Sequence, residues 1–238
     1  MNKDNPIILS AHQPVYLPWL GLFHKIAISD IFCFFDVVQY QKKDYNNRNK
    51  IKTSNGDLWL SVPVESKNHL EKNVSDILII QNDWVKKHLK SIELNYKKTP
   101  FFDKYFVELR DVLVKNSRQS LGELNLSLLQ YFINCLNIDT PIVKASDYDF
   151  TGKGSELVLD MCIKLKADKY IFGEQGKNYA NVDSFDKAGI DVYFQEYIHP
   201  VYNQRGRSFL PYMSIIDLLF NEGSNSYDVL MHENIVRV

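Results

Sequence analysis

The sequence predicts a single α/β domain, residues 1–238, with a mainly parallel, Rossmann-like three-layer sheet, a β-hairpin and a helical insertion at 84–137. Residues 7–9 form a short apolar run, residues 19–29 carry apolar side chains at helical spacing, and residues 31–35 form a second apolar run. Strand, helix and strand in this order are typical of a βαβ unit, in which the two strands are parallel. Short apolar runs alternate with helical patterns again after residue 141.

The first half of the chain is expected to contain the hairpin. Pro18 suits the first position of the helix that follows the first strand. Asn55-Gly56 is a strong signal for a two-residue turn, so residues 58–64 should pair with the segment before it. The elements expected here are, in order, a strand at 7–9, a helix at 19–29, a strand at 31–35, a hairpin strand at 58–64, a polar loop at 65–75 and a short strand at 77–80.

The second half begins with the helical insertion, in at least three pieces. Pro100 is expected to separate the first two pieces and Ser120-Leu121-Gly122 to precede the third. Ser155 is a suitable N-cap for a later helix, and Gly189 a suitable end for another. The elements expected after the insertion are a strand at 141–145, a helix at 156–166, a strand at 169–172, a helix at 182–188, a strand at 190–194 and a helix at 212–220.

Composition excludes several classes of protein. The chain is 45% hydrophobic and 24% charged, which is ordinary for a globular protein. Its 28 Lys and Arg nearly balance its 29 Asp and Glu, so bulk charge does not favour nucleic-acid or membrane binding. No apolar run reaches the roughly 20 residues of a membrane helix, and the N-terminus lacks a signal-peptide pattern. Three separated cysteines without a CxxC pair are expected to be reduced, which favours a cytoplasmic protein.

Polar side chains follow three of the expected strands. His12 and Gln13 come after the first strand, Asp36 after the second, and the loop Gly173–Gly176, which contains Glu174, after the strand at 169–172. Because parallel strands end at one edge of a sheet, we expect His12, Asp36 and Glu174 to share a crevice as catalytic groups. The glycines would let the backbone approach a ligand. The plainer alternatives are a hydrogen-bonded loop histidine, a turn-capping aspartate and a solvated glutamate.

The expected hairpin carries a local basic patch. Tyr40 and Tyr45 offer flat faces for stacking, and neighbouring asparagines, Asn47 among them, offer hydrogen bonds. A forked contact from Arg48 beside Lys50 suits a phosphate or diphosphate, so a nucleotide-sugar fits this patch. A solvated hairpin is the alternative, and the patch is small for single-stranded RNA. The five cations are Lys42, Lys43, Arg48, Lys50 and Lys52.

A late polar segment, His199–Arg205, is bracketed by Gly206 and Pro211 and is expected to act as a lid. No spacing of His, Cys and acidic residues matches a metal site, so we expect no tightly bound transition metal. The Walker A, GxGxxG and GxSxG motifs are absent from the sequence.

Several separate motifs resemble those of the WbqC-like family, in the same order and over nearly the whole chain. They are His12–Gly21, Lys25-Ile26, Ser29-Asp30, Asp36, Val38-Gln39-Tyr40, Asn47-Arg48-Asn49, Trp59-Leu60, Val62-Pro63-Val64, Gly173–Gly176, His199–Tyr202 with Gln204, and Ser214–Asn221. The resemblance implies a bacterial protein of O-antigen (lipopolysaccharide) or other surface-polysaccharide biosynthesis. It also implies transfer of an acyl or aminoacyl group, glycine being the usual proposal, to an amino sugar.

Taken with the crevice and the basic patch, the resemblance predicts an N-acyl or aminoacyltransferase that acts on a nucleotide-linked amino sugar. In this prediction His12, Asp36 and Glu174 are catalytic, and Asp217 is a further motif residue. The expected substrate-binding residues are Gln13, Tyr16, Gln39, Tyr40, Asn47, Arg48, Lys50, Gly173, Gly176, His199, Tyr202 and Gln204.

The acyl donor and two other functions stay open. A thioester, an aminoacyl-tRNA or an ATP-activated acid would each serve as donor, and no tightly bound cofactor is expected. Apart from that tRNA, no nucleic-acid or membrane partner is expected. The histidine after the first strand and the Gly173-Glu174 loop loosely resemble adenylate-forming nucleotidyltransferases, although Gln13-Pro14-Val15 stands in place of a paired His-x-x-His. An ATP-dependent amide ligase is therefore one alternative, and a non-catalytic nucleotide-sugar binding protein is the other.

Overall fold

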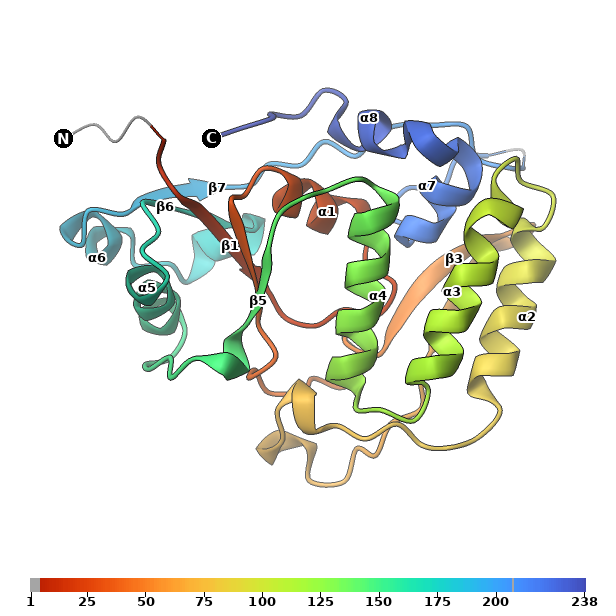
Figure 1. Ribbon diagram of the computed structural model, residues 1–238, viewed down its shortest axis with the longest axis horizontal. Helices are drawn as coiled ribbons and strands as arrows, with labels where there is room; N and C mark the ends of the chain where they lie inside the picture. Colours follow the sequence, from red (N-terminus) through yellow and green to blue (C-terminus); the bar gives the residue numbers. More distant parts are fainter. Residues whose placement is uncertain (1–4, 207) are drawn as a thin grey trace.

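The computed structural model describes residues 5–206 and 208–238 (Figure 1). Its centre is a parallel sheet in the order β5-β2-β1-β6-β7. The chain passes from β1 outward to β2 and β5, then returns to β6 on the other side of β1 and continues to β7. The strands are β1 Ile8–His12, β2 Ile31–Phe34, β5 Ile142–Lys144, β6 Lys169–Phe172 and β7 Asp191–Phe194. The strand order therefore reverses direction between β1 and β6, as in a Rossmann-like sheet.

Helices cover both faces of this sheet, which gives the three layers expected from the sequence. Leu9 of β1 lies in one core cluster with residues of α5 (Ser155–Lys164) and α6 (Val182–Lys187). Ile8 belongs to the other cluster, with residues of α1 (Leu20–Ala27) and α7 (Ile215–Glu222). Adjacent residues of β1 thus enter opposite cores, because successive side chains of a strand point to opposite faces. Cys33 and Cys162 are buried and unpaired, and Cys135 is half-buried.

Three helices follow one another between the hairpin and β5, in the segment expected to be helical. Pro100 lies between the first two, as predicted, and Ser120 is the N-cap of the third, where its Oγ accepts a hydrogen bond from the Glu123 amide at 3.3 Å. Their buried residues share the core cluster of α1 and α7. The helices are α2 Trp84–Tyr96, α3 Phe102–Asn116 and α4 Leu121–Cys135.

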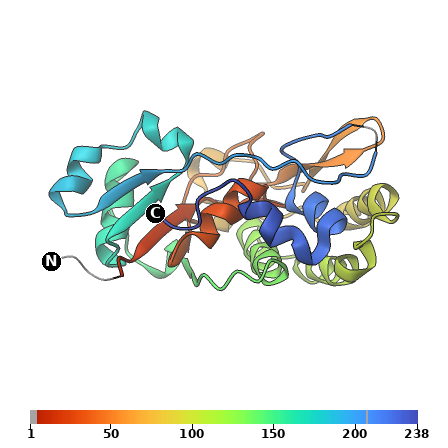
Figure 2. The ribbon, with the colours of Figure 1, turned by 90° about the horizontal axis from the view of Figure 1, so that it is seen from above.

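The hairpin consists of β3 (Arg48–Thr53) and β4 (Gly56–Ser61), paired antiparallel around the Asn55-Gly56 turn. Gly56 has φ +122°, a conformation that favours glycine. β4 ends at Ser61, earlier than expected, and Val64 beyond it forms an isolated bridge with Ile79. Seen from above, the hairpin lies with α2 and α3 at one end of the molecule, and α6 lies at the other (Figure 2).

Several expected elements differ in the structure. Residues 77–80 are not a strand: Ile79 bridges Val64 and Leu78 bridges Ser120, so neighbouring residues pair with different segments and no ladder forms. The polar loop before them contains two 3₁₀ turns, η1 (His69–Glu71) and η2 (Val74–Asp76).

Three helix starts also differ from expectation, and one helix was not expected. Pro18 precedes the N-cap of α1, which is Trp19. Gly154 is the N-cap of α5, because the Ser155 hydroxyl accepts a hydrogen bond from the Asn181 amide at 2.8 Å instead. α7 starts after residue 212, since Tyr212 has φ +61° and cannot join a right-handed helix. The additional helix is α8, Ser226–Met231.

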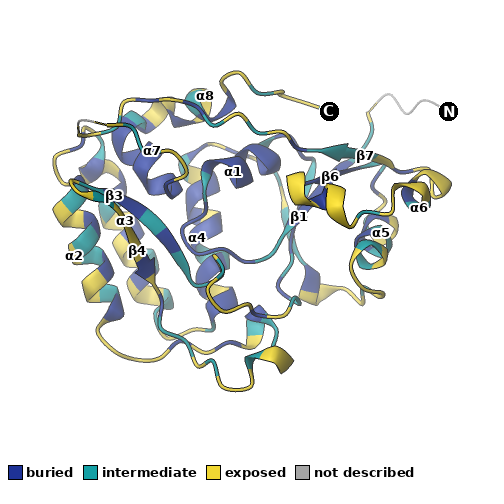
Figure 3. Cartoon of the chain, turned by 180° about the vertical axis from the view of Figure 1, so that it is seen from behind, coloured by how far each residue is buried: buried dark blue, intermediate teal, exposed yellow. Residues whose placement is uncertain are grey.

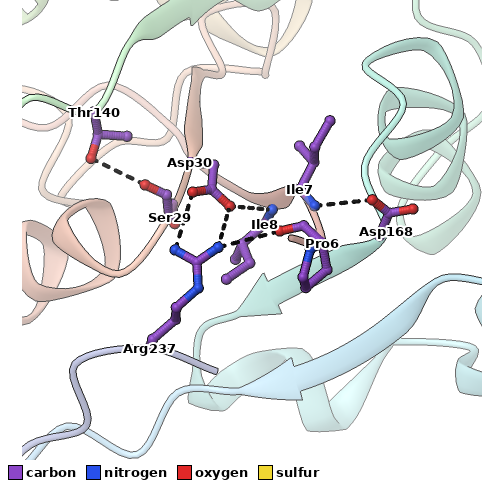
Figure 4. A network of polar contacts seen from close by, with 8 residues as sticks. All are labelled: Pro6, Ile7, Ile8, Ser29, Asp30, Thr140, Asp168 and Arg237. Atoms are coloured by element: carbon purple, nitrogen blue, oxygen red, sulfur yellow. Dashed lines mark hydrogen bonds and ion pairs between the residues drawn. The ribbon is translucent and has the colours of Figure 1, made fainter. Parts of the chain in front are cut away.

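The amino ends of β1 and β6 are closed by carboxylates (Figure 4). Asp30 Oδ2 accepts a hydrogen bond from the Ile8 amide at 2.9 Å, and Asp168 Oδ2 accepts one from the Ile7 amide at 3.0 Å. Arg237 forms an ion pair with Asp30 at 3.3 Å. This edge of the sheet is therefore held by the chain's own groups.

Candidate functional site at the carboxyl edge of the sheet

The candidate site begins where β1 and β6 separate. β1 stays paired with β2 as far as His12–Phe34, but its register with β6 ends at Ser10–Ile171. The last two residues of β1 therefore leave β6 at the point where the strand order reverses. In open α/β sheets, ligands bind at this point, outside the carboxyl ends of the strands.

His12 ends β1 as a neutral, half-buried imidazole. Its Nδ1 lies 2.8 Å from the Gln13 carbonyl oxygen, which only accepts hydrogen bonds, so Nδ1 carries the proton and Nε2 has a free lone pair. Burial, and secondly the positive charge of Lys25, lowers the pKa of His12 to about 4, although Asp44 acts in the opposite direction. At neutral pH the Nε2 atom is thus a proton acceptor.

The segment after β1 is fastened to the segment that leads into the hairpin. The Tyr16 amide donates to the Tyr45 carbonyl at 3.0 Å, and the side chain of Gln13 donates to Asp44 at 3.0 Å. The side-chain amides of Asn46 and Asn49 donate to the carbonyls of Pro14 and Leu17, at 2.8 and 2.6 Å. These two buried asparagines, which the sequence suggested as ligand contacts, instead hold the hairpin beside the end of β1.

This arrangement lines up rings from the end of β1 to the hairpin. The ring centroids of His12 and Trp19 are 5.3 Å apart, those of Trp19 and Tyr45 are 5.3 Å apart, and those of Tyr45 and Trp59 are 5.7 Å apart. Tyr45 and Trp59 remain 36% and 38% exposed. We call these four residues the aromatic row. A row of partly exposed rings offers stacking surfaces to a planar or cyclic ligand.

Cations stand at the hairpin end of the aromatic row. The guanidinium of Arg48 lies over the Trp59 ring, 4.3 Å from its centroid, and Lys50 Nζ lies 5.2 Å from it. Arg48 donates one Nη2 hydrogen bond to the Lys43 carbonyl, while its Nε has no partner in the described part of the chain. Lys50 also forms a 2.6 Å ion pair with Asp57, so a phosphate would share Lys50 with that carboxylate.

The five cations of the basic patch do not act together. Lys52 is buried, and its Nζ donates to Gln204 Oε1 at 2.9 Å and to the Ser208 carbonyl. Lys42 and Lys43 are exposed in the turn before the hairpin. Successive residues of a strand face opposite sides, so Arg48, Lys50 and Lys52 lie on one face of β3 and Asn49 and Ile51 lie on the other.

Asp36 and Glu174 end up in different surroundings. Asp36 is buried, and its Oδ1 accepts a hydrogen bond from the Ser146 amide at 2.9 Å, which joins the loops after β2 and β5. Glu174 is exposed and lies in η4 (Glu174–Asn178), the turn that follows β6. Figure 3 shows a largely exposed helical turn beside β6. Glu174 is thus accessible to a ligand, whereas the contact of Asp36 is structural.

The two glycines of this turn are used differently. A Cβ added to Gly173 would meet nothing within 4 Å, whereas one added to Gly176 would lie 2.6 Å from Phe172 Cβ. Gly176 is therefore required for packing under the turn. Gly173 faces open space and leaves its backbone approachable.

The late motif residues gather around a buried carboxylate. Asp217 is fully buried and accepts hydrogen bonds from Tyr96 and Tyr202 hydroxyls and from Gln204 Nε2, at 2.9, 2.7 and 2.7 Å. His199 Nδ1 faces the Pro200 carbonyl at 2.9 Å, and its Nε2 accepts from the Tyr212 amide at 3.1 Å. These donors satisfy Asp217 and His199, so Tyr202, Gln204 and His199 hold the late loop in place.

Four more predicted contact residues support the fold around the row. Tyr16 is fully buried and its hydroxyl lies 2.8 Å from His88 Nδ1, and Tyr40 is buried beside His69. The side chain of Gln39 donates to the Leu70 carbonyl at 2.6 Å, and that of Asn47 to the Val62 carbonyl at 2.7 Å. Their ligand-binding roles stay predictions. Of this set only Gln39 is exposed.

Sequence reasoning gave no role to three residues of this region. Trp19 and Trp59 were only motif positions, and the ring contacts that define them join each of them to Tyr45, which is 26 residues after Trp19 and 14 residues before Trp59. Lys25 lies in the otherwise apolar helix α1, and a buried lysine in such a pattern was a signal that could have found it.

A separate hollow of about 990 Å³ lies between the start of α2, including Trp84 and Leu89, and the end of α3, including Val114. None of the predicted site residues lines it. Within residues 5–206 and 208–238, no group of three His, Cys, Asp or Glu side chains could hold a metal ion, and no helix is both long and apolar enough to cross a membrane.

Comparison with known proteins identifies one family and one relative. The profile described as the WbqC-like protein family matches residues 13–229. The chain is 34% identical over 221 residues to a Mycobacterium tuberculosis (strain ATCC 25618 / H37Rv) protein named "Uncharacterized protein Rv1507c", covering 92% of this chain and 96% of that protein. No solved structure matches.

Proposed function

This chain belongs to the WbqC-like protein family, and from that membership and the aromatic row we propose that it transfers an acyl or aminoacyl group, such as glycyl, to the amine of a nucleotide-linked amino sugar. The proposal places this reaction in bacterial surface-polysaccharide (O-antigen) biosynthesis, in keeping with the resemblance described above. The observation that carries it is the unbroken line of rings from His12 to Trp59, with Arg48 and Lys50 at its far end.

The aromatic row and the cations beside it can each contact a different part of a nucleotide-sugar. A base and a sugar ring each offer a face to Trp19, Tyr45 or Trp59, and the diphosphate offers oxygens to the guanidinium of Arg48, which lies beside the Trp59 ring. With the diphosphate at the hairpin, the amino sugar would reach toward His12 at the end of β1.

The proposed chemistry needs a proton acceptor and an oxyanion site. The sugar nitrogen attacks the acyl carbonyl carbon, the C–N bond forms, and the bond to the donor's leaving group breaks with its electron pair. The nitrogen then loses a proton, for which the free Nε2 of His12 is the nearest acceptor on the row. Backbone amides of the turn after Gly173 would stabilise the oxyanion. Glu174 stays a candidate catalytic group on this exposed turn.

A second candidate has its own supporting observation. A histidine at the end of the first strand, next to a Gly-Glu turn after β6, lies at the switch point of a Rossmann-like sheet, where nucleotides bind in many enzymes. This favours an ATP-dependent amide ligase, in which the acid is activated on the protein. The third candidate function is a protein that binds a nucleotide-sugar and catalyses no reaction on it.

Turnover assays separate these functions. The protein would be incubated with a UDP- or dTDP-linked amino sugar and, in separate arms, an acyl thioester, an aminoacyl-tRNA, or a free amino acid with ATP. Mass spectrometry would detect the acylated sugar. Product in the thioester or tRNA arm supports the transferase, and product only with ATP, accompanied by AMP or ADP, supports the ligase. Binding by calorimetry without product in any arm supports the binding protein and overturns the transferase.

A further inference from the structure

A buried lysine occupies the fork between β1 and β6. Lys25 lies in the last turn of α1 and is 4% exposed. Its Nζ donates a hydrogen bond to the Ala11 carbonyl at 2.9 Å. Ala11 is the first residue of β1 beyond the register with β6, which ends at Ser10–Ile171. The ammonium group is therefore held where the two strands part, one residue before His12.

No acidic side chain balances this charge. Within the described ranges, Lys25 takes part in no ion pair, and the Ala11 carbonyl satisfies one of its three N–H donors. Asp44, the acid that acts on His12, is occupied by the Gln13 side chain at 3.0 Å and by the Tyr45 amide at 2.7 Å. A buried charge without a partner is unfavourable, and an anionic ligand beside Lys25 would supply the opposite charge.

The neighbouring groups favour an anion as that ligand. His12 is neutral, so its side chain adds no negative charge to the fork. Burial lowers the pKa of Lys25 to about 8, so the side chain is still mainly an ammonium at pH 7. Gly173, at the end of β6, leaves open space for a ligand to approach. An ammonium group and an approachable turn at the switch point are features that can together bind an oxyanion group.

We infer that the ammonium of Lys25, in the fork between β1 and β6, binds the oxyanion group of a ligand, a phosphate or a carboxylate. This inference rests on the crevice used in the proposed function but not on the transfer reaction. Since Arg48 and Lys50 lie at the other end of the aromatic row, the oxyanion at Lys25 belongs to a second ligand or a second part of the same ligand, which in the proposed reaction is the acyl donor.

The test measures the pKa of Lys25 directly. Protein labelled with ¹³C at the lysine Cε would be titrated by NMR from pH 6 to pH 10 in chloride, and again with inorganic phosphate or with acetate at equal ionic strength. A bound oxyanion stabilises the ammonium, so the pKa of Lys25 should rise by about one unit, which corresponds to a tenfold coupling between protonation and binding. A rise with phosphate only identifies a phosphate site, and a rise with acetate only identifies a carboxylate site. An unchanged pKa in both would overturn the inference.

Variants provide the second readout. Phosphate or acetate should raise the melting temperature of the wild type, and Lys25→Met should lose this rise. Lys115→Met should keep it, because Lys115 is also in the last turn of a helix but is exposed. If Lys25→Met does not fold, the wild-type titration decides alone. If an oxyanion changes the pKa or the melting temperature but no sugar is acylated, the anion site at Lys25 is supported and the proposed transferase activity is overturned. If Lys25→Met still acylates the sugar with an unchanged KM for the donor, the transferase activity is supported and the role of Lys25 in donor binding is overturned.

Discussion

The guanidinium of Arg48 lies over the indole of Trp59, with 4.3 Å between its central carbon and the ring centroid. The two residues are diagonal neighbours across the hairpin, because Arg48 of β3 pairs with Ser61 and Trp59 of β4 pairs with Lys50. The Nε atom is buried and has no hydrogen-bond partner within the described residues. The planar guanidinium beside the ring is the group type that makes a forked contact with phosphate.

Arg48→Ala should therefore weaken nucleotide-sugar binding. The lost contact is a hydrogen bond to a charged group, worth roughly 1.5–3 kcal/mol, so affinity should fall about ten- to hundredfold. Arg48→Lys should recover only part of it, because a point charge cannot reproduce the fork. Calorimetric titration of the three proteins with a nucleotide-linked amino sugar measures this, and equal affinities would show that the hairpin does not bind the diphosphate.

Trp59→Ala should reduce affinity for the same ligand by about five- to fiftyfold, because it removes both a stacking surface and the support under Arg48. Trp59→Phe should retain much of the binding. The matched control is Leu58→Ala, which removes a neighbouring side chain of similar exposure, 39% against 38%, from outside the aromatic row. If Leu58→Ala weakens binding as much as Trp59→Ala, general damage to the hairpin is the better explanation.

His12→Ala should lower kcat by about 10²- to 10⁴-fold, the usual contribution of a positioned acid or base, while nucleotide-sugar affinity changes little. His232→Ala, which removes an exposed histidine, should leave kcat unchanged. NMR of the His12 ring should also show the Nδ1–H neutral form down to about pH 5, since its pKa is lowered to about 4. A kcat for His12→Ala within threefold of wild type would contradict the role.

The two glycines of the turn after β6 give opposite predictions. Gly176→Ala should lower the melting temperature by several degrees, because its Cβ would lie 2.6 Å from Phe172. Gly173→Ala should leave the melting temperature nearly unchanged but reduce ligand affinity, because the methyl group would enter the space left for the ligand. Thermal unfolding and calorimetry on both variants test this. Normal ligand affinity in a stable Gly173→Ala protein would argue against close approach there.

Acid should destabilise the protein below about pH 6.5. Burial lowers the pKa of His88 to about 4, so between pH 6.5 and 4 the unfolded chain binds more protons than the folded one. The contribution of neutral His88 to the free energy of unfolding is complete above pH 6.5 and is lost as pH falls toward 4. This contribution amounts to about 2–3 kcal/mol. The pKa values of His12, His24 and His199 are lowered as well and act in the same direction.

Urea unfolding at pH 7, 5.5 and 4.5 measures this loss. His88→Gln, which cannot titrate, should be less stable at pH 7 but should lose less stability on acidification. His69→Gln, which replaces a histidine outside the core, should keep the full wild-type loss. A wild-type free energy of unfolding that does not change over this range would contradict burial of neutral histidines.

The sheet could be predicted from the sequence because its signals are local. Residues 31–34 and 169–172 are short apolar runs between turn residues, and such runs form strands wherever a core accepts them. Residues 77–80 show the same pattern yet form single bridges, because strand formation also requires a continuous partner. That requirement is tertiary and cannot be recognised from the run itself.

The site was predictable only in part for the same reason. His12 follows directly from its place after a strand. Asn49 looks like a ligand contact in sequence, yet its side chain bonds the Leu17 carbonyl 32 residues away. Likewise, Asp217 is a motif residue without a role predicted from the sequence, and in the structure its buried carboxylate accepts hydrogen bonds from donors such as Tyr202. A polar motif residue serves either a ligand or the fold, and only the packing distinguishes them.

The three tryptophans of the chain are Trp19, Trp59 and Trp84. Two of them stand in the aromatic row, while Trp84 is 4% exposed and packs against Tyr16 and His88 in the core. Intrinsic fluorescence is therefore divided between two residues that would sense an occupant of the crevice and one that is shielded from it. Emission from the row should respond to a bound ring or to an added quencher such as acrylamide, while Trp84 supplies a constant background. The molecule thus contains its own optical reporter, and libraries of unlabelled sugars, nucleotides and acyl donors can be screened without a coupled assay.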